Sequence, residues 1–169
     1  MTGDNYRIGI LTLSDKGACG NREDESGPLL TEMVAGLGHV ARYQVIADDM
    51  DKIILMLKRW VDDLNLDMIL TTGGTGLSPR DVTPQATEAV LEYQVSGMAE
   101  AMRAASMSKT PRAMLSRAVV GVRQKTLIIN LPGSLRAAGE NFAVLLPVLP
   151  HALAKLKGDP ADCGVSEDQ

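Results

Sequence analysis

Aromatic residues are scarce in this chain of 169 residues, in which Phe, Trp and Tyr together make up 3% of the sequence. Proteins that bind single-stranded nucleic acid stack the bases on aromatic side chains, and this sequence has little from which to build such a platform. Positive charge is also in deficit, because 17 Lys and Arg stand against 21 Asp and Glu, which gives a net charge of -4. Affinity for nucleic acid comes largely from neutralised backbone phosphates, so we expect no nucleic-acid partner.

Cysteines and long apolar runs are also few. Cys19 and Cys163 lie near opposite ends of the chain, too few for a disulfide framework and wrongly spaced for a zinc site. The segment from Met1 to Arg7 is polar and lacks the basic start and apolar stretch of a secretory signal. No apolar run approaches the roughly 20 residues that a membrane-spanning helix needs. We therefore expect a soluble, cytoplasmic protein with no membrane partner.

The length and composition predict one domain. With 45% hydrophobic and 22% charged residues, a chain of this size buries roughly 70% of its extended-chain surface, which is enough for a core without disulfides or structural metal. We expect this domain to span residues 1–158. The acidic and polar residues 159–169 are expected to form a frayed C-terminal tail.

Short apolar runs that end in turn signals predict strands. These runs cover residues 7–14, 40–47, 67–71, 119–122 and 126–130. Helical spacing of apolar residues separates them. The predicted helices run from Pro28 towards Gly38, from a cap at Asp51 to Leu64, from a cap at Thr83 to about Tyr93, over 97–107, and from 135 to 156 with breaks at Pro147 and Pro150. This alternation predicts an α/β fold, a three-layer sandwich with a mostly parallel central sheet.

The ends of the predicted strands carry polar residues. In an open parallel sheet, ligands bind outside the carboxyl ends of the strands. The strands end in Ser14 and Asp15, in Asp48 and Asp49, in a glycine loop, and in the segment 130–134. Acidic, hydroxyl and glycine positions are therefore expected to gather at one edge of the sheet.

The segment 71–84, TTGGTGLSPRDVTP, carries most of the information. It holds Gly73, Gly74, Thr75 and Gly76, and glycines there let backbone N–H groups approach an anion closely. The GK[ST] of an ATPase loop and the GxGxxG of a dinucleotide fold are both absent, so those two classes are not favoured. Arg80 can clamp a phosphate. Asp81 can hold Mg²⁺, which binds through one or two carboxylates plus substrate phosphates.

Other candidate residues have two interpretations from the residues alone. Asp48 can supply a second metal ligand, or the Asp48-Asp49 pair can be a helix-capping turn. Asp15, Asp24 and Ser26 carry the same ambiguity. The turn containing Asn130, Pro132, Gly133 and Ser134 can hold a polar ligand group with its N–H groups and the Ser134 hydroxyl, or can be a structural turn.

In its motifs and their order, the chain resembles the molybdopterin adenylyltransferase family and the related G domains of fusion proteins such as gephyrin. The matching segments are 10–15 (ILTLSD), 24–28 (DESGP), 71–84, 114–117 (MLSR) and 126–133 (TLIINLPG). The resemblance runs from about Arg7 to Gly158. Two departures are Ala47, where proline is common, and Gln85, where glutamate is common.

This resemblance implies a homotrimer and a reaction in which the terminal phosphate of molybdopterin attacks the α-phosphorus of Mg-ATP. Asp48 and Asp81 match the aspartates that coordinate Mg²⁺ and position the triphosphate. The glycine loop would hold phosphate groups, and Ser14, Asp15, Ser26 and residues 130–134 would line the rest of the pocket. We expect no metal-inserting domain like that of the fusion proteins, and we therefore expect the product to pass to a separate molybdate-inserting protein. Alternatives are a molybdopterin carrier of the same fold that does not catalyse, and an interaction module.

Overall fold

A six-stranded sheet forms the centre of the protein in the computed structural model, which describes residues 5–160. The strands lie in the order β2-β1-β3-β6-β5-β4. Their bounds are β1 Tyr6–Leu13, β2 Gly38–Ile46, β3 Met68–Thr72, β4 Tyr93–Gln94, β5 Val120–Arg123 and β6 Thr126–Leu131. Neighbouring pairs among β2, β1, β3 and β6 are parallel, and β5 runs antiparallel to both β6 and β4. The prediction of a mostly parallel α/β sheet is confirmed.

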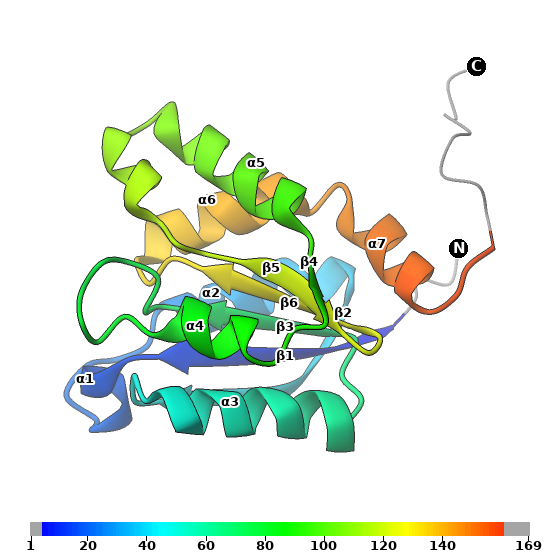
Figure 1. Ribbon diagram of the computed structural model, residues 1–169, viewed down its shortest axis with the longest axis horizontal. Helices are drawn as coiled ribbons and strands as arrows, with labels where there is room; N and C mark the ends of the chain where they lie inside the picture. The colour runs from blue at the N-terminus through cyan, green and yellow to red at the C-terminus, as the bar shows by residue number, and fades with distance from the viewer. Residues whose placement is uncertain (1–4, 161–169) are drawn as a thin grey trace.

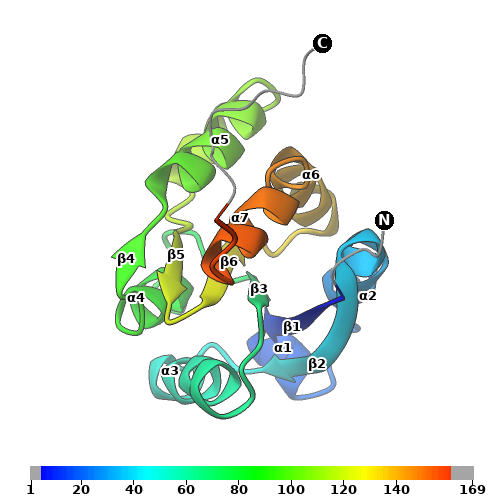
Figure 2. The same ribbon diagram turned by 90° about the vertical axis from the view of Figure 1, so that its right-hand side faces the viewer.

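Helices cover both faces of this sheet (Figures 1 and 2). The α-helices are α1 Asp15–Ala18, α2 Ser26–Met33, α3 Met50–Lys58, α4 Thr83–Glu88, α5 Ser96–Met107, α6 Leu135–Leu145 and α7 Leu149–Leu156. Three short helical turns complete the set: η1 Val34–Gly36, η2 Arg59–Asp63, which is a π-helical turn, and η3 Pro111–Leu115. Contacts within the core place α2, α5, α6 and α7 on one face and α3 and α4 on the other.

The strand β1 shows how the sequence produces these two layers. Ile8 and Ile10 are fully buried on the face of α2 and α6, whereas Leu11 and Leu13 are buried on the face of α3. A strand whose successive side chains point to opposite faces, both covered, reads as a continuous apolar run. Because β1, β2, β3 and β6 are parallel to one another, their carboxyl ends lie at one edge of the sheet. In Figure 1, α1 and the loop before α4 lie at this same end of the sheet.

Two predicted helix caps are wrong by one or two residues. Asp49 is the N-cap of α3, because its carboxylate accepts the N–H of Lys52 at 3.1 Å, and Asp51 lies inside the first turn. Thr83 is the first residue of α4, and its hydroxyl makes no capping hydrogen bond. Several polar residues precede α3, and only the backbone conformation selects Asp49 as its cap, whereas the N-cap position of α4 is Val82 and no side chain caps that helix.

Other predicted boundaries also shift. The helix α4 ends at Glu88, and Tyr93 pairs with Val122 in the sheet, so the predicted continuation of the helix to Tyr93 is wrong. A two-residue edge strand exists only because β5 is there to pair with it, which a local pattern does not show. The helix α2 begins at Ser26, two residues before the expected start at Pro28. After 134, the expected break near Pro147 divides the chain into α6 and α7, which are bent by 67°.

Within residues 5–160, no single helix is long and apolar enough to cross a membrane. Of the helices in this range, only α6 and α7 taken together, as a bent pair, reach that length and apolar composition. Both belong to the core, with Phe142 and Leu149 fully buried. Most of the expected polar tail, residues 161–169, lies outside the described part of the chain.

Candidate functional site

A cavity of about 330 Å³ opens at the carboxyl edge of the sheet. The segments after β1, β3 and β6 and the starts of α2 and α6 surround it. Of the residues predicted from the sequence, this first cavity brings together Ser14, Ser26, Asp48, Gly73, Gly74, Asp81, Gly133 and Ser134. The order of strands turns at β1, since β2 lies on one side of it and β3 on the other. The cavity therefore occupies the place where open α/β sheets bind ligands.

Asp48 has an unusual environment within the first cavity. Its Oδ2 accepts the N–H of Asp15 at 3.0 Å, whereas its Oδ1 is buried and has no hydrogen-bond partner. Burial raises the pKa of Asp48, and the nearby carboxylates of Asp15 and Asp81 add to the rise. A buried acceptor without a partner costs about 1–3 kcal/mol. The free oxygen is thus an available ligand for a cation or a donor group.

Gly74 lies directly beside this oxygen. A Cβ at Gly74 would overlap the hydroxyl oxygen of Thr83 and would lie 3.0 Å from Asp48 Oδ1. The Thr83 hydroxyl oxygen is likewise buried and without a partner. Gly74 has φ +65, and the preceding Gly73 has φ +103, a conformation that L side chains rarely adopt. Glycine at both positions lets the loop pack closely against the strand end and α4, since a Cβ at Gly73 would overlap the carbonyl oxygen of Leu13.

Asp81 and Arg80 follow in the same loop, Arg80 exposed and Asp81 half-buried. The Oδ2 of Asp81 accepts the N–H of Ser78 at 2.9 Å, which fixes the carboxylate, and it lies 2.9 Å from where a Gly76 Cβ would stand. The guanidinium of Arg80 donates to both carboxylate oxygens of Asp15, at 2.8 and 2.9 Å. This hydrogen bonding holds the pKa of Asp15 below its usual value. Asp15 and Arg80 thus lie beside the first cavity as an ion pair.

Asp24 contributes to the wall of the first cavity through a fully used carboxylate. Its Oδ1 accepts the N–H groups of Ser26 and Gly27, and its Oδ2 accepts the hydroxyls of Thr12 and Tyr43 at 2.6 and 2.5 Å. Four donors occupy the carboxylate, which lies one residue before the N-cap Glu25 and binds the first two N–H groups of α2. The structural interpretation of Asp24 at the helix start is thus consistent with these contacts, and Asp24 also lines the first cavity.

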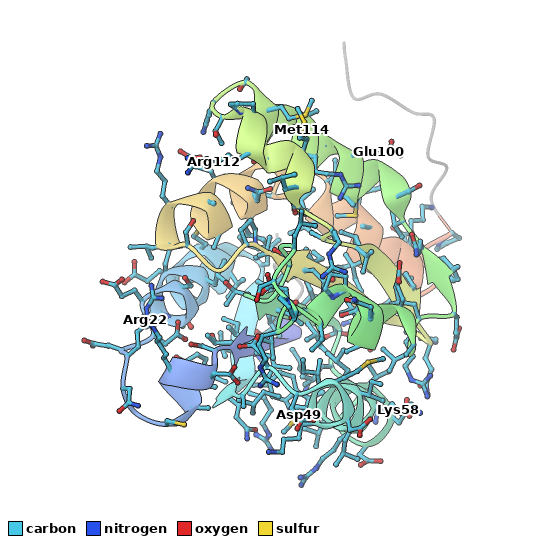
Figure 3. The ribbon with its side chains drawn as sticks, turned by 60° about the vertical axis from the view of Figure 1, so that its left-hand side comes forward. Arg22, Asp49, Lys58, Glu100, Arg112 and Met114 are labelled. Atoms are coloured by element: carbon cyan, nitrogen blue, oxygen red, sulfur yellow. The ribbon has the colours of Figure 1, made fainter. Side chains whose placement is uncertain are left out.

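A second cavity of about 270 Å³ lies on the other side of the glycine loop. Thr75, Gly76 and Pro132 line it, together with residues of α5, η3 and α6. The loop 73–76 and the turn 132–134 therefore form the wall between the two cavities. They are packed closely, since a Cβ at Gly133 would lie 3.1 Å from the Cα of Gly73. Figure 3 brings this end of the protein forward, with Arg112 and Met114 marking η3 and Arg22 marking the loop before α2.

Asn130 lies in neither cavity lining. It is fully buried, its amide donates at 2.9 Å to the hydroxyls of Thr71 and Thr87, and its Oδ1 accepts the N–H of Val119. The structure therefore gives Asn130 a role in joining β6 to β3 and α4. The sequence alone predicts Asn130 as part of the ligand-binding turn, because it lies near the end of β6, shortly before Pro132, Gly133 and Ser134.

Some residues at the site were missed by sequence reasoning. Thr12 and Arg22 line the first cavity, and Arg103, Lys109 and Arg112 line the second. The basic residues of the second cavity come from α5, η3 and the connection between them, where the sequence shows only a polar segment around Pro111. No local signal distinguishes them from solvated surface residues.

Acidic side chains are spread around the site rather than clustered. Within residues 5–160, no group of three or more His, Cys, Asp or Glu could hold a metal ion by itself. Mg²⁺ commonly takes one or two protein carboxylates and completes its octahedron with substrate phosphates and water. Asp48 and Asp81 fit a magnesium site that substrate phosphates complete. Asp48 has a buried oxygen without a hydrogen-bond partner, and the charge of Asp81 is close enough to raise the pKa of Asp48.

Known proteins resemble this chain over nearly its whole length. The family model described as "Probable molybdopterin binding domain" matches residues 9–151. The molybdopterin adenylyltransferase of Helicobacter pylori is 37% identical over 155 residues, which cover 90% of this chain and 88% of that protein. Gephyrin of Dictyostelium discoideum is 38% identical over 168 residues, which cover 93% of this chain and only 23% of that longer protein.

Solved structures agree with the sequence comparisons. The crystal structure of the molybdopterin biosynthesis enzyme MoaB from Thermus thermophilus is 49% identical and superposes with a TM-score of 0.87, covering 93% of this chain and 99% of that one. The match of the sheet and its flanking helices thus extends across most of the chain. The chain belongs to the molybdopterin-binding domain family.

Proposed function

We propose that this protein transfers the adenylyl group of ATP to molybdopterin. In this reaction a terminal phosphate oxygen of molybdopterin forms a bond to the α-phosphorus of ATP. The bond from that phosphorus to the bridging oxygen of the β-phosphate breaks, and pyrophosphate leaves with the electron pair. Adenylylated molybdopterin is the other product. Curated relatives that match about 90% of the chain carry the name of this activity.

The observation that carries the proposal is the buried, unpartnered Oδ1 of Asp48 beside the backbone of Gly74. A carboxylate oxygen left without a donor at the mouth of a phosphate-type loop suits a divalent cation that arrives with a triphosphate. Asp48 and Asp81 would hold Mg²⁺. When bound, the ion neutralises charge that develops on the phosphate oxygens.

The remaining residues of the site position substrates rather than react with them. Phosphoryl-type transfer depends on in-line geometry and electrostatic stabilisation more than on a covalent nucleophile. Gly73 and Gly74 line the first cavity and Thr75 and Gly76 line the second, so the loop can contact phosphate groups from either side, although the N–H of Gly73 itself donates to the carbonyl of Leu131 at 3.1 Å. Ser26 and Ser134 place hydroxyls at the starts of α2 and α6 in the first cavity. Arg80, paired with Asp15, supplies a cation beside it.

The further expectations from the family resemblance belong to the same proposal. We expect a homotrimer, a location in the cytoplasm, and transfer of the product to a separate protein that inserts molybdate. Light scattering of the purified protein tests the first of these, and a monomer at micromolar concentration contradicts it.

The test of the activity is pyrophosphate release from ATP and Mg²⁺ with and without molybdopterin. We expect release only when molybdopterin is present, and a loss of at least a hundredfold in Asp81→Asn. This substitution keeps an oxygen that can accept the N–H of Ser78. Binding of molybdopterin without any release of pyrophosphate indicates a carrier of the same fold and contradicts the proposal.

A further inference from the structure

One side chain closes both ends of the loop that presents Asp81. Arg117 lies between η3 and β5, and its backbone N–H donates to the carbonyl of Thr75 at 2.9 Å. Its guanidinium then reaches across the loop. The Nε donates to the carbonyl oxygen of Gly76 at 2.8 Å, and Nη2 donates to the carbonyl oxygen of Asp81 at 2.6 Å. Both ends of the segment 76–81 are therefore tied to the same planar group.

The loop has few other ties to the body of the protein. Leu77 to Arg80 are exposed, and two of the hydrogen bonds of the segment join Ser78 to Asp81 within the turn. The ion pair between Arg80 and Asp15 is exposed to solvent, and such pairs stabilise a conformation weakly. The contacts of half-buried Arg117 are charge-assisted and in part shielded from water, so they are stronger than ordinary hydrogen bonds.

The use of an arginine here is specific. The ion pairs found among residues 5–160 do not include Arg117, whereas Arg80, Arg123 and Arg136 each pair with a carboxylate. Its guanidinium instead meets neutral carbonyl groups of residues 76 and 81. A guanidinium offers donors in a fixed fork and can hold two acceptors at a set separation. A lysine in its place offers a single ammonium point and does not reproduce that geometry.

We infer that Arg117 is a positioning residue that sets the placement of Asp81 by clamping the two ends of the loop 76–81. It acts through the backbone and does not touch substrate. The inference rests on the proposed function, since it gives Asp81 its role in adenylyl transfer. In a reaction that depends on alignment, displacement of a positioned group by about 1 Å costs up to a hundredfold in rate.

The experiment compares Arg117→Ala and Arg117→Lys with Arg123→Ala. Arg123 is a matched control, because it also donates to a carbonyl, that of Val90, and pairs with Asp62 away from both cavities. Amide hydrogen exchange of the segment 77–81 is measured in each full-length protein without substrate. Pyrophosphate release then gives kcat and the KM for ATP in the presence of molybdopterin.

We expect exchange in 77–81 to rise at least tenfold in Arg117→Ala, to rise less in Arg117→Lys, and to stay unchanged in Arg123→Ala. We expect kcat to fall 10- to 100-fold in Arg117→Ala, with the KM for ATP within threefold of the wild type. Unchanged exchange in Arg117→Ala overturns the clamp. Faster exchange with an unchanged kcat overturns its role in positioning.

The exchange measurement also separates this inference from the proposed function. If the wild-type protein releases no pyrophosphate, adenylyl transfer fails, while faster exchange confined to 77–81 in Arg117→Ala still supports the clamp on the loop. If Arg117→Ala and Arg123→Ala lose melting temperature and activity equally, with exchange raised throughout the protein, Arg117 is a general structural residue and the inference is wrong.

Discussion

Asp15 and Asp48 hold each other through reciprocal hydrogen bonds. The N–H of Asp15 donates to Oδ2 of Asp48, and the N–H of Asp48 donates to Oδ1 of Asp15, both at 3.0 Å. The two residues follow neighbouring parallel strands, so the pair joins the ends of β1 and β2 at the edge of the first cavity. Arg80 makes its ion pair with Asp15, whereas Asp48 is not paired with it and keeps a buried carboxylate oxygen without a hydrogen-bond partner.

Replacement of Asp48 by Asn should stabilise the protein and abolish its activity. The amide keeps an oxygen for the N–H of Asp15 and replaces an orphaned, charged acceptor near the Thr83 hydroxyl. We expect the free energy of unfolding to rise by only about 1 kcal/mol at pH 7. The gain is limited because part of the wild-type carboxylate faces the cavity. At this chain length that corresponds to a rise of about 2–4 °C in Tm by calorimetry.

The gain in Asp48→Asn should depend on pH. Burial raises the pKa of Asp48, so the folded protein binds this proton more tightly than the unfolded chain does. The wild type then loses stability as pH rises through the raised pKa, and the difference between variant and wild type opens above about pH 4 and closes below it. A difference that is constant from pH 3 to pH 7 contradicts this account of Asp48.

Removal of Arg80 should release Asp15. The hydrogen bonds from Arg80 lower the pKa of Asp15. In Arg80→Ala the pKa of Asp15 should therefore move up towards its ordinary value, which NMR titration of the carboxyl carbon measures. The ion pair is exposed, and the melting temperature at pH 7 should change by less than about 2 °C. An unchanged titration of Asp15 shows that the pair does not form in solution.

Two glycine substitutions should have opposite effects on stability. Gly74→Ala places a Cβ against the Thr83 hydroxyl at a positive φ, and we expect a loss of about 2–3 kcal/mol in urea unfolding, together with loss of activity. Gly97→Ala is the control, because Gly97 lies in α5 and a Cβ there meets nothing within 4 Å. It should stabilise by about 0.5–1 kcal/mol. Equal effects of the two changes contradict the described loop conformation.

Asn130→Ala should be strongly destabilising, although Asn130 contacts neither cavity. It removes the amide that joins the hydroxyls of Thr71 and Thr87 and leaves the N–H of Val119 without its side-chain acceptor. We expect a loss of about 2–4 kcal/mol in urea unfolding. Gln94→Ala, which removes an exposed amide from the edge strand, should cost less than about 0.5 kcal/mol. A similar small cost for both variants contradicts the structural role of Asn130.

The sequence predicts the site as far as strand ends determine it. The predicted strands place Ser14, Asp48 and Gly73 at carboxyl ends, and parallel pairing brings those ends to one edge. The network behind them depends on partners distant in sequence. Arg117 reaches Gly76 across 41 residues, and Asn130 reaches Thr71 across 59, so only the folded arrangement assigns their roles.

Local boundaries could not be predicted for a related reason. Asp49 and Asp51 are both good capping residues, and the backbone geometry selects Asp49. Tyr93 continues a helical pattern by composition but pairs with Val122, because the edge of β5 offers it hydrogen bonds. The two cavities on either side of the glycine loop likewise follow from packing, since Thr75 and Gly76 face a different cavity from Gly73 and Gly74.

The most direct measurement of the central claim follows the α-phosphate of ATP. Wild-type protein and Asp81→Asn are incubated with Mg²⁺, molybdopterin and ATP labelled at the α-phosphate, and the products are separated. The account predicts that the label appears on the pterin in amounts equal to the pyrophosphate released, and that Asp81→Asn binds pterin but transfers at least a hundredfold less label. Label that stays entirely in ATP with the wild type, or equal transfer by Asp81→Asn, would contradict it.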